Sequence, residues 1–110
     1  MTSTALEARC AALRQPVTDL VETGILSTMK PSEIAVLIQR IGVVQAVLAE
    51  GTSGIDEESY LTWHPVAVAT LHRMEQAARG GDAAESWRLF KDPTTGFFPL
   101  SQSCAGQPGW

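Results

Sequence analysis

The hydrophobic positions of this chain recur at helical spacing, and no segment alternates apolar and polar residues as a strand does. From Ala5 to about Glu22, apolar residues return every three or four positions, which predicts one amphipathic helix. Its apolar stripe consists of Leu6, Cys10, Leu13, Val17, Leu20 and Val21. Thr4 and Glu7 have the spacing of a capping box at its start. Because Pro16 lies inside the pattern, we expect a kink there or two shorter helices, with a stop at Gly24.

A second helix is predicted from Pro31 to about Glu50, and it is apolar over most of its circumference. One apolar stripe consists of Ile34, Leu37, Ile38, Ile41 and Leu48, and a second of Val36, Val43 and Val47. A helix of this kind has to be covered on more than one side. It is therefore either the central core helix or a helix whose second stripe, Val36, Val43 and Val47, forms a homodimer seam. Gly42 would permit close helix approach in either arrangement.

A third helix follows the N-cap Asp56 and ends at Gly80-Gly81. Its expected inward stripe contains Tyr60, Leu61, His64, Val68, Leu71 and Met74. Pro65 disfavours a helical conformation at His64. We therefore expect either a short helix that ends near Trp63, followed by a second helix, or one kinked helix.

The last segments are a capped helix, a turn and a short final helix. Asp82 and Glu85 have capping-box spacing, and the residues expected to face inward are Ala83, Ala84, Trp87 and Phe90. Asp92–Gly96 has the composition of a turn, and a short helix from Pro99 to about Cys104 should follow. Helices with short connections favour antiparallel neighbours. We therefore predict an all-α, single domain over residues 1–110, an up-down-up-down four-helix bundle whose last helix is interrupted at Asp92–Gly96.

Composition and charge limit the classes of partner. The 110 residues are 45% hydrophobic, which is enough for one core, and eight basic against twelve acidic residues give a net charge of −4. The basic residues are scattered, so we expect neither nucleic acid nor a membrane as a partner. The apolar run Ile34–Ala49 is short for a bilayer span, and residues 1–22 lack the apolar core of a secretory signal. We expect a cytoplasmic protein.

Few residues suggest chemistry, and we assign no catalytic residue. The chain has no phosphate-binding glycine loop, zinc-peptidase helix or nucleophile elbow. Cys10 and Cys104 are expected to be thiols that pack as small hydrophobic residues. Alternatives are a reversible disulfide between them, or a zinc or haem site that they form with His64. Met74 is expected to fill the core and His72 to lie at the rim.

Aromatic residues gather toward the C-terminus: Trp63, Trp87, Phe90, Phe97, Phe98 and Trp110. Aromatic side chains at a helix break and in a tail either close one end of the core or line a pocket for a small apolar ligand. The candidate pocket residues are Cys10, His64, Met74, Trp87, Phe97, Phe98, Cys104 and Trp110.

The C-terminal third resembles the end of the cytochrome c′ and c-556 type four-helix bundles. The shared features are the Gly81-Asp82 junction, then Trp87 and Phe90, then Leu100 and Ser103-Cys104. In that family the last Cys opens a Cys-x-x-Cys-His haem attachment, whereas here the residues from Cys104 onward read Cys-Ala-Gly-Gln-Pro. The resemblance therefore implies a bundle and dimerisation, without covalent haem.

Three functions are compatible with these features. The first is a non-enzymatic, homodimeric helical-bundle protein that acts as a binding or accessory module. The second is a sensor that binds a small ligand, a metal or non-covalent haem in the bundle core. The third is a small enzyme with an aromatic-lined pocket.

Overall fold

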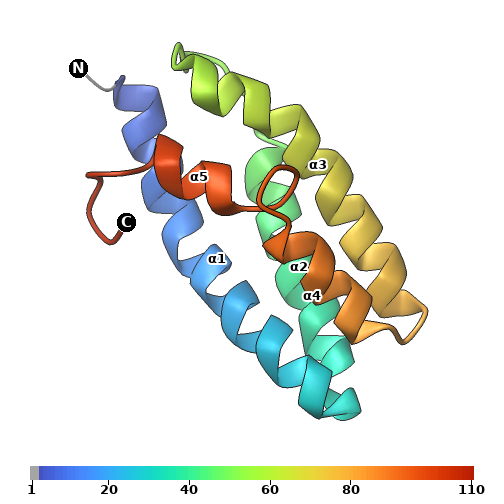
Figure 1. Cartoon of the computed structure of the whole chain (residues 1–110). Helices are drawn as coiled ribbons and strands as arrows, with labels where there is room; N and C mark the ends of the chain where they lie inside the picture. Colours follow the sequence, from blue (N-terminus) through green and yellow to red (C-terminus); the bar gives the residue numbers. More distant parts are fainter. Residues whose placement is uncertain (1–2) are drawn as a thin grey trace.

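The structure, a computed structural model, describes residues 3–110, and every regular element in this range is a helix (Figure 1). The all-α prediction is confirmed for this range. The helices are α1 (Thr4–Met29), α2 (Ile34–Leu48), α3 (Glu58–Arg79), α4 (Ala83–Lys91) and α5 (Phe98–Ser103), and the 3-10 turn η1 (Pro31–Glu33) precedes α2.

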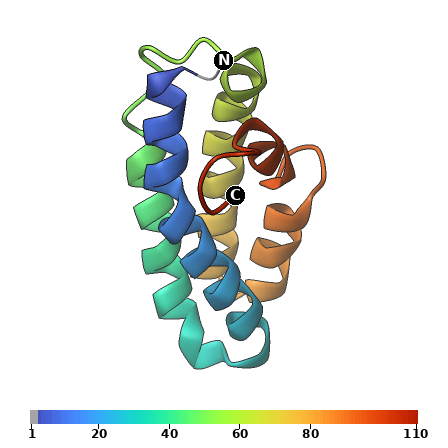
Figure 2. The ribbon, with the colours of Figure 1, turned by 90° about the vertical axis from the view of Figure 1, so that its left-hand side faces the viewer.

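The helices pack side by side around one core. Helix α1 packs against α2 and α4, and α3 packs against α2, α4 and α5. Consecutive long helices run in opposite directions, and α5 turns away from the axis of α4 (Figures 1 and 2). The molecule is 43 Å long and 23 Å wide in both other directions. A single cluster of buried residues, from Leu6 to Cys104, includes side chains of all five helices.

Helix α1 is longer than predicted and is not divided at Pro16. It continues past the expected stop at Gly24 to Met29, and Ser27 is buried within it. Gly24 does not end the helix, because it lies against the indole of Trp87 in α4. A Cβ atom at Gly24 would lie 2.7 Å from Trp87 Cε3. The capping-box prediction was also wrong: the N-cap is Ser3, whose Oγ accepts a hydrogen bond from the Leu6 N–H at 3.2 Å.

Helix α2 buries one face and leaves the other exposed. Its buried residues are Leu37, Ile41, Val44 and Leu48. Of the predicted seam, Val43 is 48% exposed, whereas Val36 and Val47 are half-buried and Val47 packs against the core. By length and composition alone, Pro31–Leu48 could cross a membrane, with a mean hydropathy of 1.3, although we expected the run to be too short. Only 22% of these residues are buried inside the molecule.

Helix α3 is one continuous helix that includes His64 and Pro65. The expected displacement of His64 from the helix was therefore wrong. Its buried residues are Tyr60, Trp63, Ala67, Thr70, Leu71, Met74 and Ala78. The stripe predicted to face inward was rotated about the helix axis relative to the observed buried face, because Leu61 and Val68 are exposed. Since α3 also contacts α4 and α5, its buried face is turned toward those helices and includes Trp63.

The interruption at Asp92–Gly96 is present, and its geometry explains its sequence. Asp92 Oδ1 accepts hydrogen bonds from the backbone N–H groups of Thr94 (2.9 Å) and Thr95 (2.8 Å). A Cβ atom at Gly96 would lie 2.2 Å from the carbonyl oxygen of Phe90, so no side chain fits there. Helix α4 has the predicted cap, with Asp82 Oδ1 accepting from the Glu85 N–H at 3.0 Å. Ala84, expected to face inward, is exposed.

The two cysteines form a disulfide, which corrects the expectation that they are thiols. The Cα atoms of Cys10 in α1 and Cys104 at the end of α5 are 5.7 Å apart, and both residues are fully buried. The bond joins helices that are 94 residues apart in the chain. Beyond it the C-terminal tail folds back onto α1, where Trp110 Nε1 donates a hydrogen bond to the Cys10 carbonyl at 2.9 Å.

Candidate functional site

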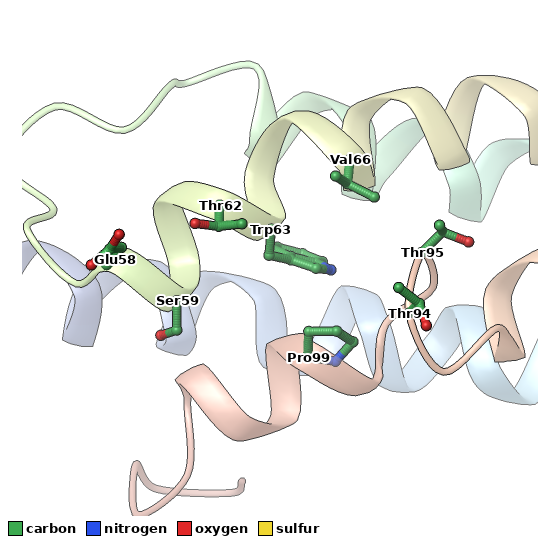
Figure 3. A pocket seen from close by; sticks show the side chains of 8 residues that line it. All are labelled: Glu58, Ser59, Thr62, Trp63, Val66, Thr94, Thr95 and Pro99. Atoms are coloured by element: carbon green, nitrogen blue, oxygen red, sulfur yellow. The ribbon is translucent and has the colours of Figure 1, made fainter.

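A pocket of about 590 Å³ lies between the first half of α3 and the chain around the Asp92–Gly96 interruption (Figure 3). We call it the α3–α5 pocket. Its lining residues are Glu58, Ser59, Thr62, Trp63 and Val66 from α3, Thr94 and Thr95 from the interruption, and Pro99 from α5. Figure 3 shows the Trp63 indole projecting from α3 toward the threonines, with the Pro99 ring on the opposite wall.

Hydrogen bonds between the two walls hold the α3–α5 pocket in shape. Trp63 Nε1 donates to the carbonyl of Gly96 at 2.9 Å, and Thr70 Oγ1 donates to the carbonyl of Thr95 at 2.6 Å. At the other end, Ser103 Oγ donates to Ser59 Oγ at 3.0 Å. Each bond joins α3 to a segment more than 20 residues away, so the pocket is formed before any ligand arrives.

The α3–α5 pocket combines apolar surface with hydroxyl groups and a carboxylate. Trp63, Val66 and Pro99 supply the apolar surface, and the serine and threonine side chains supply the hydroxyl groups. Among residues 3–110, Glu58 is the only titratable side chain in the lining.

Several predicted aromatic residues form a stack behind the pocket rather than its lining. The rings of Trp87 and Phe90 are stacked with centroids 5.2 Å apart, and those of Phe90 and Phe97 are stacked at 4.8 Å. Phe97 then meets Trp63 edge to face at 5.3 Å. Trp63 thus connects the stack to the pocket, and Trp87 and Phe97 support it from the core.

Three other predicted residues meet in a second hollow, between α1 and α5. Phe97, Phe98 and Trp110 line a volume of about 500 Å³ together with Val17, Val21, Phe90, Lys91 and Ser101. Phe98 is 58% exposed, which makes it the most exposed aromatic residue among residues 3–110. The hollow beside these aromatics is an open groove.

The remaining pocket candidates lie apart from both hollows. The sulfur atoms of Cys10 and Cys104 are bonded to each other, so neither is a thiolate that could bind a metal. His64 Nε2 lies 2.8 Å from the carbonyl oxygen of Leu48, and Met74 is buried. Within residues 3–110, no group of three His, Cys, Asp or Glu side chains is arranged to hold a metal ion.

A third surface feature, the α2–α3 face, is apolar and uncharged. One hollow of about 480 Å³ is lined by Leu48 at the end of α2, by Ala49 directly after it and by Pro65, Val68 and Ala69 of α3, together with Gln45, Leu71 and His72. By helical spacing, Gly42 and Ala46 extend this surface along α2, and Leu61 extends it along α3. We define the α2–α3 face as Gly42, Ala46, Ala49, Leu61, Pro65, Val68 and Ala69.

Glu75 meets the edge of the α2–α3 hollow and is paired: its carboxylate accepts a hydrogen bond from Gln45, which lines the hollow, at 3.2 Å and one from Arg79 at 2.8 Å. No charged residue occurs from Ser59 to His72, and Arg40 is the only one from Ile34 to Ala49. Arg40 turns toward α1, where its guanidinium lies 3.1 Å from the carboxylate of Asp19. Val68 is 45% exposed and Leu61 37% exposed on this face.

Comparisons of the chain with protein-family models, with curated proteins and with solved structures found no match. Functional inference therefore depends on the geometry of these surfaces. None of the residues that line the α3–α5 pocket was among the predicted pocket residues, and Trp63 belonged only to the wider group of C-terminal aromatics. The one signal in the sequence was the interruption at Asp92–Gly96, which places one wall of the pocket.

Proposed function

We propose that this protein is a non-enzymatic helical-bundle module that homodimerises through the α2–α3 face and acts as a binding or accessory component. The observation that supports this proposal is the apolar, uncharged surface shared by two adjacent helices. We class the architecture as an up-down-up-down four-helix bundle with an interrupted last helix. The antiparallel course of α1 to α4 and the packing of α1 against both α2 and α4 support this class.

A second copy of the chain suits the α2–α3 face for three reasons. The α2–α3 face carries no charge with which a charged partner could pair, whereas the same face of a second copy presents an apolar surface that can pack against it. Val68 projects beside a hollow lined by Pro65 and Leu71, so in a two-fold arrangement each Val68 can enter the hollow of the other copy. If the two copies of α2 cross antiparallel, their helix dipoles point in opposite directions, which is the favourable arrangement.

The size of the face corresponds to a small interface. At a rise of about 1.5 Å per residue and a diameter of about 10 Å per helix, two adjacent helices of this length present a surface of about 22 by 20 Å, or about 440 Å². Standard interfaces bury about 800 Å² of accessible surface on each partner, so the face suits a weak, concentration-dependent dimer. Gly42 leaves room for close approach, since a Cβ atom there would meet nothing within 4 Å.

Light scattering coupled to size-exclusion chromatography, from about 1 to 100 μM protein, tests this proposal. We expect the wild type to run as a dimer and Val68→Glu to run as a monomer, because the dimer would bury two unpaired carboxylates. Val66→Glu is the matched control: Val66 is 36% exposed on α3 but lies outside the α2–α3 face. A monomeric wild type at 100 μM, or equal effects of both variants, would contradict the proposal.

The disulfide bears on where the module works. Disulfides of this kind persist in oxidising compartments and are rare in the reducing cytoplasm. The bond between Cys10 and Cys104 therefore favours an oxidising compartment over the cytoplasmic location that we expected from the sequence. Alkylation of free thiols at the moment of cell lysis tests this point: a folded protein with two free thiols would favour the cytoplasm instead.

A further inference from the structure

We propose that the α3–α5 pocket binds a small organic cation with a flat apolar body, of the arylalkylamine class. This proposal does not depend on the dimer. Successive residues of a helix are about 100° apart, so Val66 in the pocket points away from Val68 in the α2–α3 face. Both surfaces can be occupied at once.

The dimensions and rigidity of the α3–α5 pocket suit a small molecule. A volume of about 590 Å³ falls within the roughly 300–1,000 Å³ of ordinary ligand pockets. The walls are joined by the hydrogen bonds from Trp63 to Gly96 and from Thr70 to Thr95. A ligand therefore does not have to order these segments, which lowers the entropy lost on binding.

The apolar lining favours a flat body. The Pro99 ring, Val66 and the threonine methyl groups supply most of the apolar lining, and Trp63, which is 3% exposed, contributes the small part of its indole that reaches the pocket opposite Pro99 (Figure 3). Aromatic rings bury a large area with little loss of conformational freedom. The backbone N–H groups of Thr94 and Thr95 are already bonded to Asp92, so hydroxyl groups and the Glu58 carboxylate are the polar partners left to a ligand.

The charge of the pocket favours a cation. Glu58 lines it, no Lys or Arg side chain does, and Asp56 and Glu57 precede Glu58 at the start of α3. The carboxylate of Glu57 is held by Ser3, whose N and Oγ donate to it at 2.6 and 2.7 Å. Among residues 3–110, Glu58 has no such hydrogen-bond or ion-pair partner. The full negative charge of the Glu58 carboxylate outweighs the partial positive charge of about one half at the helix N-terminus.

The orientation of the ligand follows from where these groups lie. Glu58 marks one end of the pocket, and Thr94 and Thr95 mark the other, with Trp63 between them (Figure 3). An ammonium group next to Glu58 would thus place an aromatic ring against Trp63 and Pro99.

The proposal is tested by nuclear magnetic resonance titration of the wild-type protein at pH 7. The probes are 2-phenylethylamine, 2-phenylethanol and 3-phenylpropionate, which share the ring and differ in charge. We expect shifts at the Trp63 indole N–H and at Thr62 and Thr94. The amine should bind roughly two- to five-fold more tightly than the alcohol, as one exposed ion pair provides, and the carboxylate should bind most weakly.

Two variants test separately where the ligand binds and how its charge is recognised. Glu58→Gln should make the affinities for the amine and the alcohol equal while the shifts stay at the same residues. Val66→Trp should fill the pocket and abolish the shifts, whereas Val68→Trp, the matched control in an otherwise wild-type chain, should leave them. Tightest binding of the carboxylate, an amine preference that survives Glu58→Gln, or shifts that survive Val66→Trp would each overturn the proposal. The oligomeric state of the wild type does not affect these outcomes.

Discussion

Breaking the disulfide between Cys10 and Cys104 should remove a large part of the stability of this domain. The bond closes a loop of 94 residues in the unfolded chain. In the loop-entropy description, a cross-link over about 100 residues stabilises the folded state by about 4.7 kcal/mol at 25 °C. Domains of this size have a total unfolding free energy of only about 5–15 kcal/mol. The reduced protein should therefore retain between about 0 and 10 kcal/mol of unfolding free energy, a loss of at least about a third.

The same free energy predicts a change in melting temperature. An unfolding entropy of about 2.1 cal/mol/K per residue over 110 residues amounts to about 0.23 kcal/mol/K. Dividing 4.7 kcal/mol by this entropy gives a decrease in Tm of about 20 °C. The decrease should be similar for the chemically reduced wild type and for the double variant Cys10→Ala/Cys104→Ala.

Circular dichroism at 222 nm measures this prediction, with and without reductant, in samples whose free thiols are counted. The double variant in reductant is the control, because its Tm should not respond to the reductant. A decrease below about 5 °C in fully reduced protein would refute the entropic reasoning. It would mean that the reduced unfolded chain keeps α1 and α5 together, or that the bond imposes native-state strain of similar size.

Three further changes test the interruption and its contact with α3. Gly96→Ala should destabilise the protein by about 2–4 kcal/mol in chemical denaturation, because the added Cβ atom would overlap backbone atoms of Phe90 and Asp92. Gly42→Ala is the control: its added Cβ atom points into open space, so the change should be neutral or stabilising by up to about 1 kcal/mol. Trp63→Phe should cost about 1–3 kcal/mol, because the buried Gly96 carbonyl loses its donor; an unchanged denaturation midpoint would show that this bond contributes nothing. Hydrogen bonds from the backbone of Thr95 and Thr94 lower the pKa of Asp92, so its contribution to stability is present above the unfolded pKa of about 3.9 and is lost as pH falls through the folded pKa. Asp92→Asn should therefore reduce the loss of Tm between pH 6 and pH 3, and an identical loss in both proteins would contradict this assignment.

Local signals in the sequence were sufficient for the helices and for several of their ends. The three- and four-residue periodicity identified α1 to α4, and the Asp82 cap and the turn at Asp92–Gly96 were located correctly. These features depend on groups within a few residues of one another, so a single sequence contains them. The interruption also indicated where a pocket would lie, although not which residues would line it.

Local signals failed wherever a distant residue decided the outcome. Glycine often marks the end of a helix, yet α1 continues through Gly24, where the indole of Trp87 packs against it. The inward face of α3 was assigned to Val68 from its own periodicity. Contacts with α4 and α5 turned that face toward Trp63 instead.

The cysteines also show which properties the sequence determines and which depend on tertiary packing. Their positions on helical segments could be read from the sequence, and a reversible bond between them was one of the alternatives. Whether the two Cα atoms come within 5.7 Å depends on how α5 leaves the interruption and lies against α1. Helical periodicity is a property of neighbouring residues and is written in the sequence. Which faces meet, and so where the disulfide, the α3–α5 pocket and the α2–α3 face lie, is decided by packing between helices far apart in the chain.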